Sequence, residues 1–307
     1  HTYFVDPQER NISETQLQGG FEGIGVTVEM TKDGKVRVVA PQEGSPGEKA
    51  GIQPGDLITH VDGKSLAGLT LTQAVSLIRG PKDTTVTLTI ARENAPDPLT
   101  FEIARAEIRV ESVRAEMLDQ NVAYIRISQF GTQTSGELKT ALQQLLDQNP
   151  QGLILDLRAN PGGYLVAAVD VASQFLKDGI VLVEERSGGE RQAYRVKQGG
   201  IATDIKMVIL VDKGSASASE IVAGALQDYE RATLIGTTTY GKGSMQSVHT
   251  LSDGSSIHVT IAHWLTPKER PINGNGLVPD VEVQYPNDPV AEGDPQLDKA
   301  IEVLVGQ

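Results

Sequence analysis

A serine and a lysine occupy positions from which they can build a hydrolytic centre. Ser217 lies in the run Gly-Ser-Ala-Ser-Ala-Ser-Glu at 214–220, shortly after the apolar stretch Met207 to Val211. Lys242 lies further along the chain between Gly241 and Gly243. A serine hydroxyl is a good nucleophile only when a base takes its proton, and an uncharged lysine amine can be that base. The two residues therefore indicate a serine/lysine hydrolase.

The sequence around Lys242 favours an uncharged amine. Burial lowers the pKa of a lysine side chain because the ammonium form loses its hydration. The window from Leu234 to His249 contains no Asp or Glu, so no acid that is close in the sequence can hold Lys242 in its charged form. We therefore predict a base here rather than one partner of a salt bridge.

Ser217 also stands where a helix is expected to begin. Ser217 and Glu220 have the spacing of a capping box, and the apolar run Ile221 to Leu226 follows. Free backbone N–H groups and the positive end of the helix dipole would then converge near the hydroxyl, where they can stabilise an oxyanion. The alternative interpretation is that Ser217 serves only as a helix cap.

Three motifs together carry a resemblance to a known family. They are Gly-Ser-Ala-Ser-Ala-Ser-Glu at 214–220, Tyr-Gly-Lys-Gly-Ser-Met-Gln at 240–246 and Asp-Leu-Arg-Ala-Asn-Pro-Gly-Gly at 156–163. The chain closely resembles, over nearly its whole length, the C-terminal processing peptidases, also called tail-specific proteases. The resemblance implies a serine endopeptidase that cleaves proteins near their C-termini, with a PDZ domain beside a layered α/β core of the ClpP/crotonase type, and with no cofactor or metal.

The resemblance also assigns roles to individual residues. It implies Ser217 as nucleophile, Lys242 as base and Gln246 as a supporting residue, with the N–H groups of Gly163 and Ala218 as the oxyanion hole. Four residues of extended chain are too long for the Gln246 amide to reach Lys242 directly. Only the resemblance therefore indicates a supporting role for Gln246. The alternative is that Gln246 is an ordinary polar residue at the start of a strand.

The stretch from 21 to 105 resembles a PDZ domain. In such a domain a glycine-rich loop offers backbone N–H groups to a terminal carboxylate while the peptide adds as a strand to the sheet edge. We predict a ligand with an apolar C-terminal residue, and the alternative is a structural β-sandwich without a ligand. The expected peptide-binding residues are Phe21, Gly23, Ile24, Gly25, Val26, Leu71, Val75 and Ile78.

Arg79 closes the predicted helix 71–78, just before Gly80 and Pro81. A cation at a helix C-terminus is stabilising on electrostatic grounds alone. The sharper hypothesis is that Arg79 lies at the boundary with the catalytic core and reports peptide occupancy to the region of Lys242 and Gln246.

From about residue 107 onward, strands and helices alternate, which favours a layered α/β core. We expect a capping box from Thr134 to Glu137 at the start of the first core helix. The predicted domains are an N-terminal remnant at 1–20, the PDZ domain at 21–105, the protease core at 106–285 and a tail with a helix at 286–307. Expected strands are 122–127, 152–157, 180–184, 207–211, 233–238 and 255–267, and expected helices are 135–146, 164–176, 217–229 and 295–304.

Composition narrows the partners and the compartment. The net charge of −13 over 307 residues disfavours nucleic acid or an anionic membrane surface as the main partner. No apolar run approaches the roughly 18 residues that a membrane span needs. The absence of cysteine excludes disulfides and a thiol nucleophile. The resemblance implies an extracytoplasmic enzyme (periplasm, cell envelope or thylakoid lumen) made from a longer precursor, and it leaves a homodimer open.

Several alternatives remain. The glycine-rich run at 236–244 is superficially similar to a phosphate-binding loop, but glycine follows Lys242 where Ser or Thr should stand. No His-Glu-x-x-His spacing supports a zinc peptidase. A triad of Ser217 with His249 or His258 and an aspartate stays open, because triads assemble from distant segments. A non-catalytic peptide-binding scaffold and an enzyme that rests misaligned until peptide binds are further alternatives.

Overall fold

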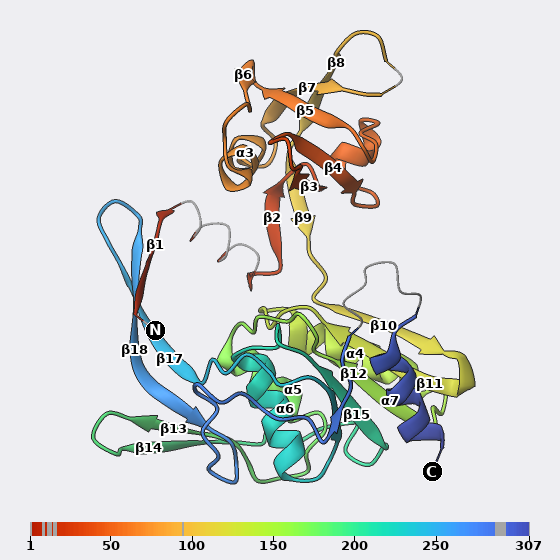
Figure 1. Cartoon of the computed structure of the whole chain (residues 1–307), viewed down its shortest axis with the longest axis vertical. Helices are drawn as coiled ribbons and strands as arrows, with labels where there is room; N and C mark the ends of the chain where they lie inside the picture. Colours follow the sequence, from red (N-terminus) through yellow and green to blue (C-terminus); the bar gives the residue numbers. More distant parts are fainter. Residues whose placement is uncertain are drawn as a thin grey trace.

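The computed structural model describes residues 2–7, 10, 14, 17–93, 95–285 and 293–306 of the chain. Figure 1 shows a smaller β-rich unit and a larger α/β unit, joined by β2 (Gly20–Gly23) and β9 (Ala106–Arg109). These two strands pair antiparallel, with Phe21 opposite Ile108. The chain therefore enters and leaves the smaller unit through one two-stranded ribbon.

The smaller unit is strand-rich and has its own hydrophobic core. Its sheet has the order β3-β4-β5-β7-β8, so β3 lies at an edge, with β4 as its one partner among the described strands. The helix α3 begins after the N-cap Thr70, whose capping box with Gln73 is complete. Its elements are β3 (Val26–Met30), β4 (Val36–Pro41), α2 (Pro46–Lys49), β5 (Leu57–Val61), β6 (Lys64–Ser65), α3 (Leu71–Ile78), β7 (Thr85–Ala91) and β8 (Leu99–Ala104).

The larger unit is built on a six-stranded sheet of order β10-β11-β12-β15-β16-β19, in which only the β10 pairing is antiparallel. The layered α/β core expected from the sequence is confirmed. Its elements are β10 (Val113–Leu118), η1 (Asp119–Asn121), β11 (Val122–Ile127), α4 (Thr134–Leu146), β12 (Gly152–Asp156), α5 (Leu165–Ala172), β15 (Met207–Val211), α6 (Ala218–Asp228), β16 (Thr233–Gly236), β19 (Val281–Glu282) and α7 (Pro295–Val305).

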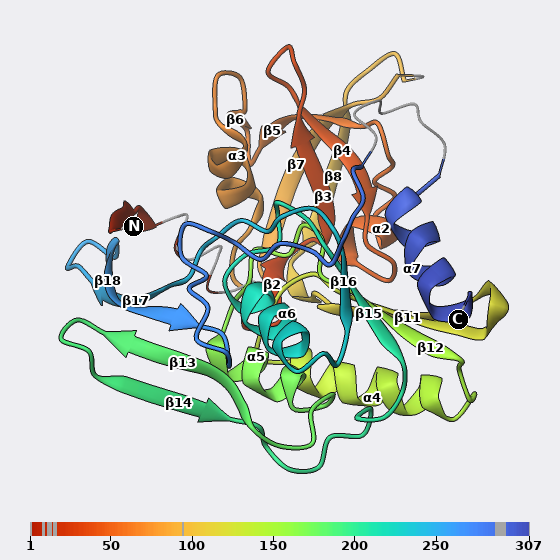
Figure 2. The ribbon, with the colours of Figure 1, turned by 60° about the horizontal axis from the view of Figure 1, so that its bottom comes forward.

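Both faces of this sheet are covered, which explains the near-continuous apolar strands. Leu153 and Leu155 of β12 point into the core shared with α4, α5 and α6, while Ile154 between them packs with Ala300 and Leu304 of α7. Figure 2 shows α4, α5 and α6 grouped together and α7 apart from them. The alternation of side chains along each strand thus fills two hydrophobic layers.

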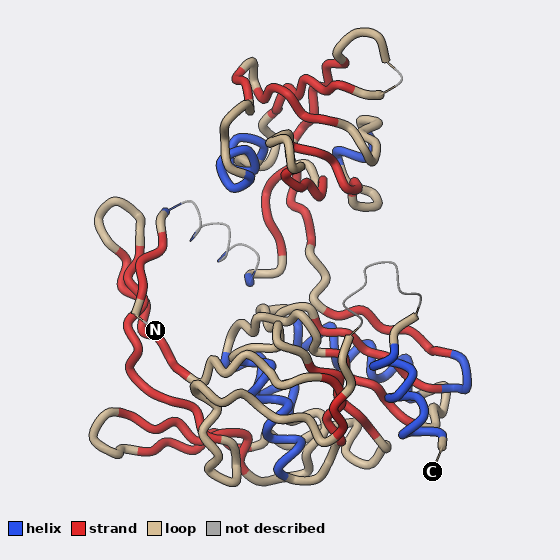
Figure 3. Tube along the Cα trace, viewed as in Figure 1, coloured by secondary structure: helices blue, strands red, loops and turns tan. Residues whose placement is uncertain are grey.

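A further sheet extends from the core as an arm and contains the longest strand, β18. It consists of β1 (Tyr3–Val5), β13 (Ile180–Arg186), β14 (Arg191–Arg195), β17 (Ser244–Thr250) and β18 (Ser256–Leu265). The strand β17 pairs antiparallel with β18, and the register shifts at a bulge between Met245 and Gln246. Figure 3 shows these strands projecting beside the helical part of the larger unit.

Every strand and helix expected in the larger unit is present, several with shifted ends, such as α5, which ends at Ala172, and β16, which ends at Gly236. The strands 122–127 and 207–211 and the helix 71–78 are confirmed residue for residue. The predicted capping box from Thr134 to Glu137 is wrong, because α4 begins after Gln133 without a side-chain cap. Thr134 instead accepts the Gly131 N–H, and Glu137 accepts the N–H of Ser112. Both side chains thus fasten neighbouring loops rather than the helix end.

None of the described helices has the length and apolarity that crossing a lipid bilayer requires.

The packing of α7 on the sheet gives a stability prediction. Leu304 is 6% exposed and contacts Gly152, where a Cβ would come within 2.8 Å of Leu304 Cδ2. We expect Leu304→Ala to lower the free energy of unfolding by about 2–5 kcal/mol because it leaves a cavity over the sheet. Val305→Ala, at a position 37% exposed, should change it by about 0.5 kcal/mol or less. Urea denaturation of both variants measures the difference, and equal effects would contradict the burial of this helix face.

Candidate active site

Ser217 lies between β15 and α6 in a strained backbone conformation. It is the N-cap of α6, with φ 55° and ψ −113°. A residue with a Cβ pays about 1–3 kcal/mol for such a conformation, which persists only where its surroundings enforce it. The Ser217 N–H donates to Oε2 of Glu220 at 2.9 Å. The predicted pairing of Glu220 with the helix start is therefore present, and it holds the strained residue.

Lys242 is carried by a loop that packs very closely against the chain at 273–276. A Cβ on Gly243 would stand 2.2 Å from the Asn273 nitrogen, and one on Gly241 would stand 3.0 Å from the Gly276 nitrogen. The glycines that flank Lys242 are thus required by close backbone approach. The side chain is partly buried, and within the described residues its Nζ forms no hydrogen bond or ion pair. The predicted absence of a salt-bridge partner at Nζ therefore agrees with the described residues.

Glu220 brings the two candidate catalytic residues together. Its side chain is fully buried, and Oε2 accepts the N–H of Lys242 at 3.0 Å as well as the N–H of Ser217. No hydrogen bond between Ser217 Oγ and Lys242 Nζ is present in the described part of the chain. Sequence reasoning identified Glu220 only as a cap partner. Its bond to Lys242 was missed because the window around Lys242 contains no acid, whereas the folded chain supplies one from α6.

The backbone on either side of Gly163 is hydrogen-bonded to Phe130. Phe130 donates its N–H to the Gly162 carbonyl at 2.9 Å, and Tyr164 donates to the Phe130 carbonyl at 2.7 Å. In this parallel bridge the N–H of Gly163 itself points away from Phe130. Gly163 has φ +145°, and a Cβ there would lie 2.2 Å from the Phe130 oxygen, so only glycine fits.

Gly162 places this loop against the nucleophile. A Cβ on Gly162 would stand 2.8 Å from Ser217 Cβ and 3.0 Å from the nitrogen of Ala218. Ala218 is the first residue of α6, where backbone N–H groups lack partners within the helix. The Gly163 loop, Ser217 and Ala218 therefore lie next to one another, and the roles expected of them stay predictions.

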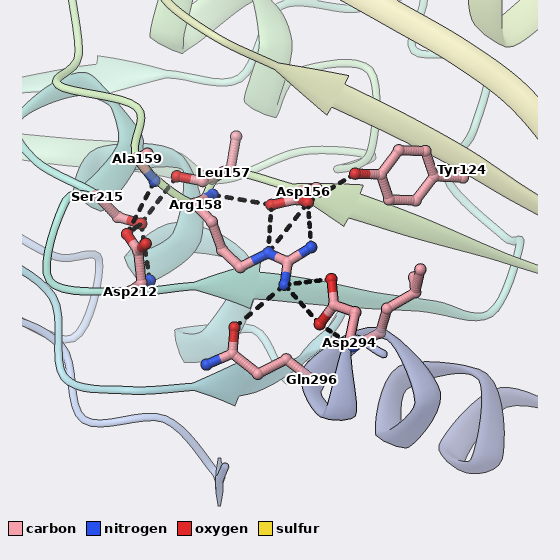
Figure 4. A network of polar contacts seen from close by, with 10 residues as sticks. Tyr124, Asp156, Leu157, Arg158, Ala159, Asp212, Ser215, Asp294 and Gln296 are labelled. Carbon is pink, nitrogen blue, oxygen red and sulfur yellow. Dashed lines mark hydrogen bonds and ion pairs between the residues drawn. The ribbon is translucent and has the colours of Figure 1, made fainter. Parts of the chain in front are cut away.

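Further hydrogen bonds lock the two loops that follow β12 and β15. Asp212 accepts the Ala159 N–H at 2.8 Å, and Ser215 Oγ donates to the Leu157 carbonyl at 2.8 Å (Figure 4). The Asn160 carbonyl accepts the N–H of Ala216 at 3.0 Å. The loop at 157–163 and the loop that carries Ser217 therefore form one cross-linked unit.

A buried charge network anchors the base of the 157–163 loop. Arg158 binds Asp156 through Nη2 at 2.6 Å and Asp294, the N-cap of α7, through Nη1 at 2.8 Å (Figure 4). Burial acts to lower the pKa of Arg158, but the hydrogen bonds and charges of the two aspartates outweigh it and raise that pKa. Burial and the charge of Asp156 raise the pKa of Tyr124, whose hydroxyl donates to Asp156, to about 12. Sequence reasoning did not foresee this network.

Gln246 lies on β17 directly after the bulge, opposite Thr260. A bulge changes which way the following side chains point, so the distance from Gln246 to Lys242 expected for a straight strand does not apply here.

His258 stacks on Tyr3 at 4.8 Å and contacts Ser256 Oγ at 3.2 Å. Neither His249 nor His258 has a hydrogen bond to Ser217 within the described residues. The geometry therefore gives the triad alternative no support.

The predicted peptide groove is bounded by the edge strand β3 and by α3. Val26 begins β3, and Gly25 before it has φ +68°. Leu71 and Val75 are partly exposed on α3, whereas Ile24 and Ile78 are buried in the core of the smaller unit. The expectation that the side chains of Ile24 and Ile78 contact a peptide is therefore wrong for this structure, because both belong to the core of the smaller unit.

Phe21 and Gly23 belong to β2, at the junction of the two units. The Arg79 guanidinium lies over the Phe21 ring, 4.2 Å from its centre, and a Cβ on Gly23 would stand 3.2 Å from Cε2 of that ring and 3.7 Å from Cγ of Arg79. Burial lowers the pKa of Arg79. A cation–π contact of this kind fixes Arg79 on the strand that leads toward the larger unit.

Comparisons with known proteins agree with this architecture. A model of peptidase family S41 matches residues 121–283, and a PDZ domain model matches residues 37–92. A carboxyl-terminal-processing protease from Synechocystis sp. (strain ATCC 27184 / PCC 6803 / Kazusa) is 38% identical over 99% of this chain and 73% of its own length. The carboxy-terminal processing protease CtpA of Bacillus subtilis (strain 168) is 40% identical over 93% of this chain and 61% of its own length.

Solved structures show the same fold. The photosystem II D1 C-terminal processing protease is 31% identical, with a TM-score of 0.57 over 94% of this chain and 79% of that chain. A putative S41 protease from Bacteroides fragilis has a TM-score of 0.60 at 19% identity over 94% of this chain and 83% of that chain, which shows a shared fold.

The buried network around Arg158 gives a second stability prediction. Arg158 is 10% exposed and Asp156 is 0% exposed. We expect Arg158→Ala to cost about 3–5 kcal/mol of unfolding free energy because it leaves a buried carboxylate without its charge partner. Arg191→Ala is the control, since Arg191 is 45% exposed between Glu185 and Glu269 and should cost about 1 kcal/mol or less. Thermal and urea unfolding report both values. A loss for Arg158→Ala no larger than that of the control would refute the anchoring role.

Proposed function

The chain belongs to peptidase family S41 as a serine-type carboxyl-terminal processing peptidase with a PDZ domain, and from this premise we propose that Ser217 and Lys242 are its catalytic dyad. The observation that carries the proposal is the bridge through Glu220, which binds the backbone of both residues. Gln246 is proposed as a supporting residue on the resemblance of its motif. The proposed protease core is 106–285, and the proposed PDZ domain is 21–105.

The proposed reaction is acyl transfer to water. Uncharged Lys242 takes the proton of Ser217 Oγ as that oxygen attacks the substrate carbonyl, and the Gly163 and Ala218 N–H groups bind the resulting oxyanion. The C–N bond then breaks, and the lysine gives its proton to the departing amine. Water repeats the sequence on the acyl-enzyme and releases the carboxylate product.

The proposed substrates are proteins whose apolar C-terminal tails bind the PDZ domain. A peptide that adds to the edge of β3 would gain main-chain hydrogen bonds, while the partly exposed Leu71 and Val75 of α3 contact its side chains. The extracytoplasmic location and the homodimer remain predictions from the sequence. We further propose that tail binding stimulates cleavage, with Arg79 linking the groove to β2 through Phe21.

The dyad is tested by cleavage of a protein with an apolar C-terminal tail. We expect Ser217→Ala to lower kcat/KM by at least about 10³-fold, because the nucleophile is lost. Lys242→Ala should lower it by about 10²–10⁴-fold, because the base and acid are lost. Mass spectrometry of the products identifies the cleavage site.

Lys213→Ala, at an exposed lysine of the loop that precedes Ser217, is the matched control and should cleave like the parent. Tail binding without cleavage by the parent would instead identify a peptide-binding scaffold. Cleavage by Ser217→Ala at the parental rate would rule out the serine nucleophile.

Arg79 is tested by comparing cleavage of a short tailless substrate with and without an added tail peptide. We expect Arg79→Ala to lower the stimulated-to-basal ratio by about fivefold or more, because the coupling between the groove and β2 is broken. Arg37→Ala, at an exposed arginine paired with Glu29 in the same unit, should leave the ratio unchanged. Intact peptide binding together with an intact ratio in Arg79→Ala would remove the gating proposal.

A further inference from the structure

We propose that Glu220 is a positioning residue for the reaction, because its buried carboxylate fixes the nucleophile-bearing and base-bearing backbones relative to each other. This inference rests on the proposed dyad of Ser217 and Lys242. It goes beyond the capping role that the sequence indicates, since a cap would bind only the start of α6.

The carboxylate of Glu220 is saturated by donors from two separate parts of the chain. Oε2 accepts the N–H groups of Ser217 and Lys242, at 2.9 and 3.0 Å. Oε1 accepts Thr239 Oγ1 at 2.6 Å and the Gly241 N–H at 2.7 Å. Three of the four donors therefore come from the loop that carries Lys242, and the fourth is the backbone of the nucleophile.

The donor set requires a carboxylate rather than any polar group of that shape. Thr239 Oγ1 accepts the Leu277 N–H at 2.7 Å, so its single hydrogen is committed to Glu220. All four partners are then donors, and an ionised carboxylate, which only accepts, matches all four. A glutamine amide would turn two N–H donors toward two of these donors, so its near-identical size would not preserve the bridge.

The Glu220 carboxylate restricts the movement of the Ser217 backbone relative to the Lys242 backbone. The nitrogens of Ser217 and Lys242 bind the same oxygen atom. The base-bearing loop has two further backbone contacts: the Gly274 N–H donates to the Gly241 carbonyl at 2.9 Å, and the Tyr240 N–H donates at 3.0 Å to the carbonyl of Ser215, in the loop that carries Ser217. Loss of the carboxylate would remove the link at Ser217 and Lys242 themselves, and we expect it to change the separation of their side chains and to release the strained backbone of Ser217.

The test compares Glu220→Gln with Glu137→Gln. Glu137 is a matched control because its Oε2 likewise accepts two backbone N–H groups, from Ser112 and Val113, and a hydroxyl, none of them from the loops that carry Ser217 and Lys242. The measurements are kcat and KM on the tailed substrate, the rate at which a fluorophosphonate labels Ser217, affinity for a tail peptide, and the thermal midpoint.

We expect Glu220→Gln to lower kcat and the labelling rate together by about 100-fold, the loss that a misplacement of about 1 Å produces. KM and tail-peptide affinity should stay within about twofold of the parent, because the groove lies in the other unit. Glu137→Gln should keep the parental kcat even if its thermal midpoint falls. A parental kcat in folded Glu220→Gln, or a loss matched by Glu137→Gln at equal destabilisation, overturns the positioning role.

Thr239→Val provides a milder variant should Glu220→Gln not accumulate as folded protein. It removes one donor and leaves the carboxylate, so we expect the labelling rate to fall by about threefold to tenfold at unchanged KM; an unchanged rate overturns the inference.

Ser217→Ala in the same assay separates the two proposals. If Ser217→Ala cleaves the substrate at the parental rate, the proposed dyad is wrong. If Ser217→Ala is inactive and Glu220→Gln cleaves at the parental rate, only the positioning role of Glu220 is wrong.

Discussion

One buried carboxylate constrains the whole candidate active site. The proposed chemistry needs a hydroxyl and an amine close together, yet Ser217 and Lys242 come from different loops, and Ser217 sits in a backbone conformation that a serine does not adopt by itself. Glu220 holds the strained residue and links the two backbones, because the oxygen that accepts the Ser217 N–H also accepts the Lys242 N–H. The positions of the other groups matter only once this bridge is in place.

The rest of the core brings the loop at 157–163 to that bridge. The parallel neighbours β12 and β15 have their C-terminal ends side by side, so the loops that follow them, at 157–163 and 212–217, meet there. Asp212, Ser215 and the Asn160 carbonyl then cross-link them. Arg158 ties the first loop to α7, which lies on the opposite face of the sheet from α6. Helices on both faces of the sheet thus help to hold the loops at the C-terminal ends of these strands.

The sequence allowed the peptidase family and the buried elements to be predicted, because both depend on local patterns. The strand before Ser217 and the helix after it follow from apolar periodicity, whereas the dyad of Ser217 and Lys242 stays a prediction. The two glycines that flank Lys242 were recognised in the sequence. The requirement for glycine comes from tertiary structure, because both pack closely against the backbone at 273–276. The same holds for Thr134 and Glu137, whose partners in space replaced the expected capping box.

Long-range partners explain what the sequence could not predict. Glu220 was visible as a neighbour of Ser217, but its contacts with residues 239–242 depend on how two distant loops pack. The same limit applies to the Arg158 network and to the ribbon of β2 and β9. A search for acids near Lys242 in the sequence found none, although the fold delivers one to its backbone.

The most direct measurement is the detection of scalar couplings across the hydrogen bonds of Glu220 by nuclear magnetic resonance in deuterated protein. The account predicts that the amide nitrogens of Ser217 and Lys242 both couple to the carboxyl carbon of Glu220. The carboxyl of Glu137, which accepts the Ser112 and Val113 amides, provides the internal reference. Couplings present at Glu137 and absent from both amides at Glu220 would contradict the account.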